Sequence, residues 1–172
     1  MFAIAVLTTL VTLFIVLPTA YASVIGAPFV PAYRSQVRDI VSAAGIEDGD
    51  IIYELGAGNG QVAVAFAGSG NVKVTGFELA PLLYLLAKIN LKLKRVRNCR
   101  IYLRNFYNYP LNDANVVYFF LMPKTVEVVA KKLAAELRPG ARIVSYAFPI
   151  REWAPSAVIE KPGQQRIFVY KI

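Results

Sequence analysis

The sequence predicts an α/β protein built on a doubly wound, mainly parallel sheet. Short apolar runs, typical of buried parallel strands, alternate along its 172 residues with stretches of helical periodicity. A glycine-rich loop, Gly56 to Gly60, directly follows the first apolar run, residues 51–55. Two short strand-like segments separated by Pro162 and Gly163 end the chain, and they indicate a hairpin that closes the sheet.

Each predicted element has a local reason in the sequence. Residues 34–44 place four apolar side chains on one helical face, and Gly45 is suited to end that helix. Pro81 falls in a first helical turn, where proline is tolerated, and Pro139 with Gly140 ends a later helix. We expect helices at residues 34–44, 61–67, 80–94 and 124–137, and strands at residues 51–55, 72–78, 100–103, 115–121, 141–147, 157–160 and 166–170.

The N-terminal segment carries no Asp, Glu, Lys or Arg before Arg34. Its apolar stretch of about 25 residues would extend roughly 37 Å as a helix, enough to cross a hydrocarbon layer of about 30 Å. Basic residues follow this stretch and none precedes it, so the positive-inside rule places the rest of the chain on the cytoplasmic or matrix-equivalent side. We therefore expect a single-pass transmembrane anchor at residues 1–28 and a folded domain at residues 29–172. A cleaved secretory signal ending near Ala22 and a helix buried inside the protein are the alternatives.

The composition excludes several kinds of chemistry. Cys99 is the single cysteine and the chain has no histidine, so neither an intrachain disulfide nor a histidine-based triad can form. Zinc and other transition metals bind mainly through Cys and His side chains. We therefore expect no metal site.

The net charge of +8 is unevenly distributed. No acid lies between Glu78 and Asp113, and that interval contains Lys88, Lys92, Lys94, Arg95, Arg97, Arg100 and Arg104. Contact with anionic headgroups of a bilayer is one interpretation, at about 1 kcal/mol per residue near the surface. A solvated helix end is the other leading one. Nucleic acid binding is less favoured than either.

The sequence around the glycine loop reads IIYELGAGNG, with Glu54 two residues before the first of three alternating glycines, Gly56, Gly58 and Gly60. Such a loop between a strand and a helix brings backbone N–H groups close to a ligand. The dinucleotide fingerprint G-x-G-x-x-G would need a glycine at Gln61. The acid and the shorter spacing instead resemble motif I of the class I methyltransferases that use S-adenosylmethionine (SAM).

This resemblance implies how SAM would be held. The loop Gly56-Ala57-Gly58-Asn59-Gly60 would contact its methionine portion, and Glu54 would receive its ammonium group directly or through water. Glu78 ends the second strand, 18 residues after Gly60, and would accept both ribose hydroxyls, with Leu79 beside it. The alternative for Glu78 is an acid placed favourably at a helix N-terminus.

Two further segments follow strands that end at the same edge of the predicted sheet. Asn105 and Phe106 follow the third strand and would contact adenine, or form an Asn turn beside a core Phe. The fourth strand leads into Leu121, Met122 and Pro123, not into the Asn/Asp-Pro-Pro-Tyr/Phe motif of enzymes that methylate base or glutamine amino groups. These three residues would line an apolar channel for an alkyl amine, or pack at the strand end.

Nearly the whole chain resembles the membrane-anchored lysine methyltransferases of mitochondria, which modify the c-subunit of ATP synthase or the adenine nucleotide translocase, and their prokaryotic relatives. The similar segments are the apolar N-terminus, PFVPAY, the helix before the first strand, YELGAGNG, GFELAP, NVVYFFLMP, KKLAAELRPGARIVSYAFPI and Trp153-Ala154-Pro155. Where the family usually has Gly-Asp after the third strand, this chain has Arg104-Asn105. That departure bears on the adenine contact and on the choice of substrate.

The resemblance implies a Rossmann-like seven-stranded sheet whose last strand is antiparallel, and methylation of a lysine in a membrane protein. Tyr33 would be a lid or substrate contact, and no catalytic base is identified. Methyl transfer from a sulfonium to a neutral amine needs alignment and desolvation more than a metal or a histidine. A methyltransferase for a lipid or small molecule, an RNA methyltransferase, and a SAM-fold module without turnover are the alternatives.

Overall fold

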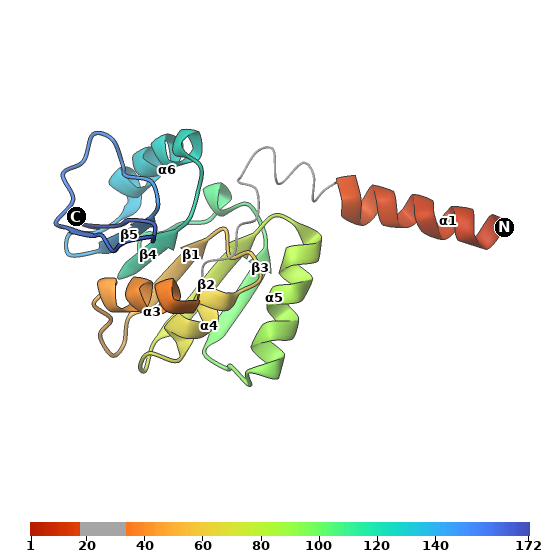
Figure 1. Ribbon diagram of the computed structural model, residues 1–172, viewed down its shortest axis with the longest axis horizontal. Helices are drawn as coiled ribbons and strands as arrows, with labels where there is room; N and C mark the ends of the chain where they lie inside the picture. Colours follow the sequence, from red (N-terminus) through yellow and green to blue (C-terminus); the bar gives the residue numbers. More distant parts are fainter. Residues whose placement is uncertain (18–33) are drawn as a thin grey trace.

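The computed structural model describes residues 1–17 and 34–172, and this part contains a seven-stranded sheet in the order β3-β2-β1-β4-β5-β7-β6 (Figure 1). β7 runs antiparallel to both of its neighbours, and the pairs among β1 to β5 are parallel. The strands are β1 (Ile51–Leu55), β2 (Lys73–Glu78), β3 (Cys99–Leu103), β4 (Val116–Phe119), β5 (Arg142–Tyr146), β6 (Ala157–Ile159) and β7 (Ile167–Lys171). The expected Rossmann-like sheet with an antiparallel last strand is confirmed.

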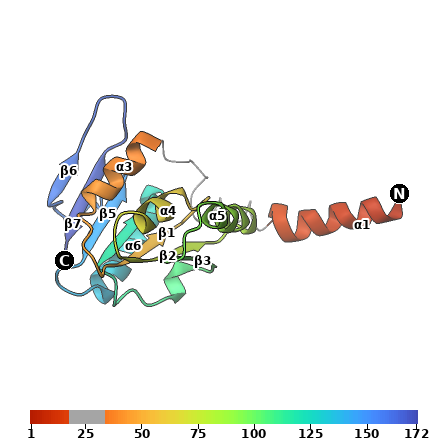
Figure 2. The same cartoon turned by 90° about the horizontal axis from the view of Figure 1, so that it is seen from below.

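The helices of the domain form two layers around this sheet. They are α3 (Arg34–Ala43), α4 (Gln61–Ala67), α5 (Pro81–Leu93), the 3₁₀ turn η2 (Phe106–Asn108) and α6 (Pro123–Glu136). α3, α4 and α5 bury their apolar side chains against one face, whereas α6 and the η2 segment cover the other (Figure 2). This arrangement of helices on both faces explains why the central parallel strands are mainly apolar and buried.

β1 lies where the strand order reverses, with β2 and β3 on one side and β4 and β5 on the other. Side chains alternate between the two faces of a strand. Ile52 packs with the helices α3 to α5, and Glu54 shares its face, whereas Tyr53 and Leu55 pack on the α6 side. The last residues of β1 therefore deliver one carboxyl group to the edge at which α/β sheets bind their ligands.

The expected strands and helices of residues 34–172 are confirmed, with bounds that shift by one or two residues. The fourth strand is the main exception, because pairing with β5 ends at Phe119 and the chain then turns into α6 at Pro123. The turn η2 agrees with the Asn turn that the sequence offered as one interpretation of Asn105 and Phe106. It forms because the Asn105 side chain accepts a hydrogen bond from the Tyr107 backbone N–H, at 3.0 Å.

The N-terminal helix consists of α1 (Phe2–Val11) and the π-helical segment η1 (Thr12–Val16), and no residue of α1 is buried. Within the described parts of the chain, no helix is both long enough and apolar enough to span a membrane. The predicted transmembrane helix is therefore not found there, and residues 18–28 of that prediction lie outside the described residues.

Candidate active site

The glycine loop after β1 uses backbone geometry that favours glycine. Gly56, Gly58 and Gly60 have φ values of 83°, 55° and 75°, in the left-handed region where a side chain is unfavourable. The backbone N–H groups of Gly56 and Ala57 both donate to the carbonyl oxygen of Phe77, at 3.0 and 2.8 Å. The loop is thereby tied to the end of β2.

Close packing of α5 against the start of α4 requires the third glycine. A Cβ on Gly60 would lie 3.0 Å from the Cβ of Ala87 and 3.3 Å from Cδ1 of Leu91. Gly76 in β2 plays a similar part, because its Cβ would lie 2.9 Å from the Cβ of Ala57. Because Gly60 and Gly76 have no side chains, α5 and β2 can pack closely against the loop.

The Glu78 carboxylate faces the glycine loop from the end of β2. Its Oε2 accepts a hydrogen bond from the Gly58 N–H at 2.7 Å. Its Oε1 accepts from the N–H groups of Leu79 and Ala80, both at 2.8 Å, directly before α5. The side chain thus joins the glycine loop to the N-terminus of α5, as the helix-terminus interpretation expects, and its contact with a ribose stays a prediction.

Glu54 is a buried carboxyl group whose hydrogen bonding is incomplete. The residue is 2% exposed, it accepts a hydrogen bond from the Ala63 backbone N–H in the first turn of α4, and its Oε2 has no partner among the described residues. Burial, and secondarily the charge of Glu78, raise the pKa of this carboxyl group well above its usual 4.5. A buried acceptor without a partner is unfavourable on its own, so this site fits a bound cation such as the ammonium group of SAM.

Asn105 and Phe106, the predicted adenine contacts, both have structural roles in the protein alone. The Asn105 Oδ1 accepts the Tyr107 N–H, and Phe106 is buried in the core on the α6 side, with its ring centroid 4.4 Å from that of Tyr107. This is the Asn turn beside a core Phe that was the alternative from the sequence. A contact of these residues with adenine stays a prediction.

The predicted substrate residues have different environments. Leu121 is buried, and its Cδ2 lies 3.3 Å from the point where a Cβ on Gly56 would be. Met122 is exposed and Pro123 begins α6. Leu121 therefore packs on the glycine loop, Met122 is accessible beside it, and the prediction for Tyr33 lies outside the described residues.

An aromatic group near the ends of β4 and β5 was missed by the sequence reasoning. The ring of Phe120 lies 4.8 Å from that of Tyr146 and 6.5 Å from that of Phe148. The Tyr146 hydroxyl donates to Oε1 of the buried Gln36, in the first turn of α3. A signal was present, because Gln36 lies four residues before Ile40 and so shares the apolar face of its helix.

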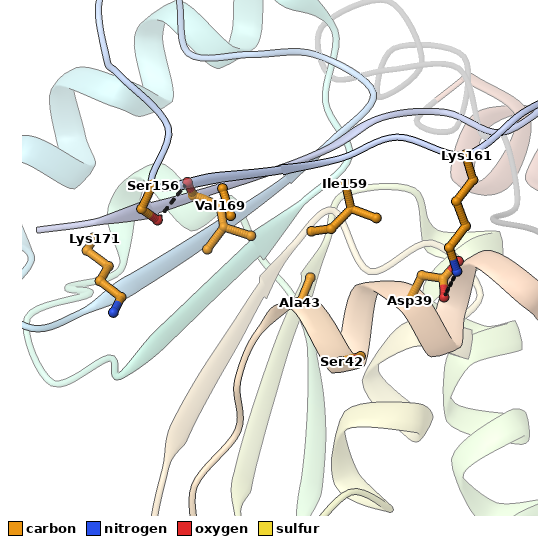
Figure 3. Close-up of a pocket in the computed structure, with 9 residues that line it drawn as sticks. Asp39, Ser42, Ala43, Ser156, Ile159, Lys161, Val169 and Lys171 are labelled. Atoms are coloured by element: carbon orange, nitrogen blue, oxygen red, sulfur yellow. Dashed lines mark hydrogen bonds and ion pairs between the residues drawn. The ribbon is translucent and has the colours of Figure 1, made fainter.

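A pocket lies between α3 and the β6–β7 hairpin, away from the glycine loop (Figure 3). Its charged side chains include Lys161 and Asp39, which form an ion pair at 2.6 Å, and the Ser156 hydroxyl donates to the Val169 carbonyl at 3.1 Å. None of its lining residues belongs to the glycine loop or to β2. In residues 1–17 and 34–172 no group of three or more Cys, Asp or Glu side chains could hold a metal ion.

Comparison with known proteins shows the family to which this chain belongs. Residues 54–157 match the family described as the ANTKMT methyltransferase domain. A protein-lysine N-methyltransferase from Saccharolobus islandicus is 35% identical over 83% of this chain and 91% of its own length. The mouse adenine nucleotide translocase lysine N-methyltransferase is 32% identical over 84% of this chain, and the match spans 63% of that relative.

Solved structures agree with the sequence relatives. An RNA methyltransferase from Salinibacter ruber in complex with S-adenosyl-L-homocysteine superposes with a TM-score of 0.79 and 25% identity, over 83% of this chain and 94% of that one. A SAM-dependent methyltransferase from Thiobacillus denitrificans, at 20% identity and a TM-score of 0.61 over 68% of this chain and 49% of that one, shows the same fold. The resemblance seen in the sequence is confirmed: this chain belongs to the ANTKMT methyltransferase domain family and is a methyltransferase that uses SAM.

Proposed function

We propose that this enzyme methylates the side-chain amine of a lysine in a membrane protein. The observation that carries the proposal is the 35% identity to a protein-lysine N-methyltransferase across 91% of that relative's length. Further relatives are the human lysine N-methyltransferase of the ATP synthase c-subunit, at 28% identity, and the mouse adenine nucleotide translocase enzyme. The relatives act on lysine in proteins, which favours that acceptor over a lipid or a small molecule.

The residues at the end of the sheet suit this reaction. SAM supplies a methyl group on a sulfonium, so a C–N bond forms to a neutral amine as the C–S bond breaks, and the amine then loses its proton. Glu54 would hold the ammonium group of the cofactor, and Glu78 with the glycine loop would fix its ribose. The buried Leu121 and the aromatic group of Phe120, Tyr146 and Phe148 would exclude water from the incoming amine. Alignment and desolvation of this kind account for much of the rate in such transfers.

We also propose that the N-terminal segment tethers the enzyme to a membrane, with the domain on the cytoplasmic or matrix-equivalent side. The absence of charge before Arg34 supports this, as does the exposure of the apolar side chains of α1. A tether raises the effective concentration of a substrate in the same membrane.

The test is transfer of labelled methyl groups from SAM to membrane protein, lipid and RNA fractions by the full chain. Label should appear in the protein fraction and, after acid hydrolysis, in methylated lysine. The variant Glu78→Ala should abolish the transfer, whereas Glu160→Gln, which removes an exposed acid on the hairpin, should leave it unchanged. Label in lipid alone would overturn the proposal. Label in RNA alone would favour the function of the Salinibacter ruber protein instead.

A further inference from the structure

The outward side of α5 is apolar, although it faces solvent. Five side chains of this helix are between 43% and 76% exposed, and we call them the α5 stripe: Leu82, Leu85, Leu86, Ile89 and Leu93. α5 buries Ala87 and Leu91 against the rest of the domain. At about 100° per residue, the centre of the stripe lies about 180° from those two residues. A helix on the surface of a globular domain normally has polar residues there.

The apolar surface continues beyond α5. Leu86, Ile89 and Leu93 also line a groove whose other wall includes Val64 and Ala65 of α4. A contiguous apolar surface of this kind marks a contact with a protein or a membrane.

Basic side chains surround the α5 stripe. Lys88 and Lys92 lie on one flank of the helix, about 60° to 100° from the centre of the stripe. Lys94, Arg95 and Arg97 follow its C-terminal end, and all five side chains are exposed. Because no acid occurs between Glu78 and Asp113, nothing in this segment neutralises them. Apolar residues on one side with a basic flank are the pattern of helices that lie in the interface of an anionic bilayer.

The N-terminal helix lies next to α5. The segment η1 contacts α5, and α1 continues from it away from the domain (Figures 1 and 2). The exposed apolar side chains of α1 include Phe2, Leu7 and Leu10, and no charged side chain interrupts them. The N-terminal helix and α5 are thus in contact, and both expose apolar side chains to solvent.

We propose that α5 docks on an anionic lipid surface, with the α5 stripe in the interface and the flanking lysines and arginines on the phosphate headgroups. A second copy of this chain is a poorer occupant, because joining two stripes would bring two basic flanks together in a protein that already carries a net charge of +8. This contact is additional to any tether formed by the N-terminal segment.

Binding of the full chain to vesicles tests the proposal. The probes are vesicles of phosphatidylcholine alone and of phosphatidylcholine mixed with phosphatidylglycerol, measured by co-sedimentation. The triple variant Leu85→Ser, Ile89→Ser, Leu93→Ser should weaken binding to the anionic vesicles about tenfold or more. The matched control is Val128→Ser on α6, which also removes a 53% exposed apolar side chain and should change binding little. α1 is identical in all variants, so its contribution to vesicle binding cancels when the variants are compared.

Charge variants give a second reading. Lys88→Gln with Lys92→Gln should reduce the preference for anionic over neutral vesicles, whereas Lys124→Gln with Lys131→Gln, which removes two exposed charges on α6, should retain it. Unchanged vesicle binding by the triple variant would overturn the proposal. So would a triple variant whose only change is a smaller mass in solution, since the stripe would then join two copies of the chain. No methyl acceptor enters the assay, so its result does not depend on the proposed substrate.

Discussion

Glu78 accepts hydrogen bonds from three backbone N–H groups, one in the glycine loop and two directly before α5. Replacing the carboxylate in Glu78→Gln would set an amide group against donors that need an acceptor. We expect the affinity for SAM to fall about 10- to 100-fold, the equivalent of losing one hydrogen bond to a charged group. Calorimetry on the folded variant measures this, with Glu160→Gln as the control. If Glu78 only caps α5, the melting temperature will fall but the affinity will not.

Glu54 predicts an unusual dependence of stability on pH. Its pKa is raised in the folded protein, chiefly by burial, so the folded state holds this proton more tightly than the unfolded state does. The contribution of Glu54 to the free energy of unfolding is therefore fully present below about pH 4.5. It is lost as the pH rises toward the folded pKa, by at most about 1.4 kcal/mol per pH unit. In Glu54→Gln this loss should disappear from urea unfolding measured between pH 4.5 and 8, while SAM binding weakens. A variant with the same pH profile as the parent would contradict the assignment.

The sequence allowed the positions of Glu54, the three glycines and Glu78 to be predicted because their relation is local. Each lies at the end of a strand or directly after it, and parallel strands end at one edge of the sheet. The hydrogen bond between Tyr146 and Gln36 joins residues 110 positions apart. No local spacing reveals such a pair. Asn105 was ambiguous for another reason, since an Asn after a strand serves a turn as readily as a ligand.

At the scale of elements, Gly60 controls how closely α5 approaches α4. Gly60→Ala adds a Cβ at 3.0 Å from Ala87 Cβ, at a φ of +75°. The matched control is Gly163→Ala in the hairpin turn, where φ is +70° and no atom lies within 4 Å. We expect the control to lose about 1 kcal/mol of unfolding free energy from backbone strain alone, and Gly60→Ala to lose about 1–3 kcal/mol more from crowding. Urea denaturation of both variants measures the difference, and equal losses would show that the helices simply move apart.

The elements were predictable because each strand is a short apolar run and each helix has a clear stop. Gly and Pro mark most of these ends. The turn η2 depends on one side-chain hydrogen bond, so hydrophobic periodicity could not predict it. For the N-terminal segment, hydropathy predicted a spanning helix within residues 1–28. No helix of the described residues meets that prediction, and residues 18–28 lie outside them.

At the scale of the whole molecule, Cys99 can report opening of the fold. It is the single cysteine, it is buried in β3, and burial raises the pKa of its thiol from 9.0 to about 12. Because the thiolate is the reactive form, alkylation at pH 8 should be about 10³-fold slower in the folded protein than in the unfolded chain. Added SAM should slow it further, as ligand binding to the folded state requires. Rapid alkylation that SAM does not affect would show that β3 opens on its own.

The course of α5 has one more consequence. Its first turn adjoins the Glu78 carboxylate, and its last turn lies at the opposite rim of the sheet. If α5 lies flat on a lipid surface, both of its ends are at the same height above that surface. In this orientation of α5, the glycine loop and Glu78 would face along the plane of the membrane. Reachable amines would then be those projecting just above the lipid, a zone that few freely diffusing proteins present.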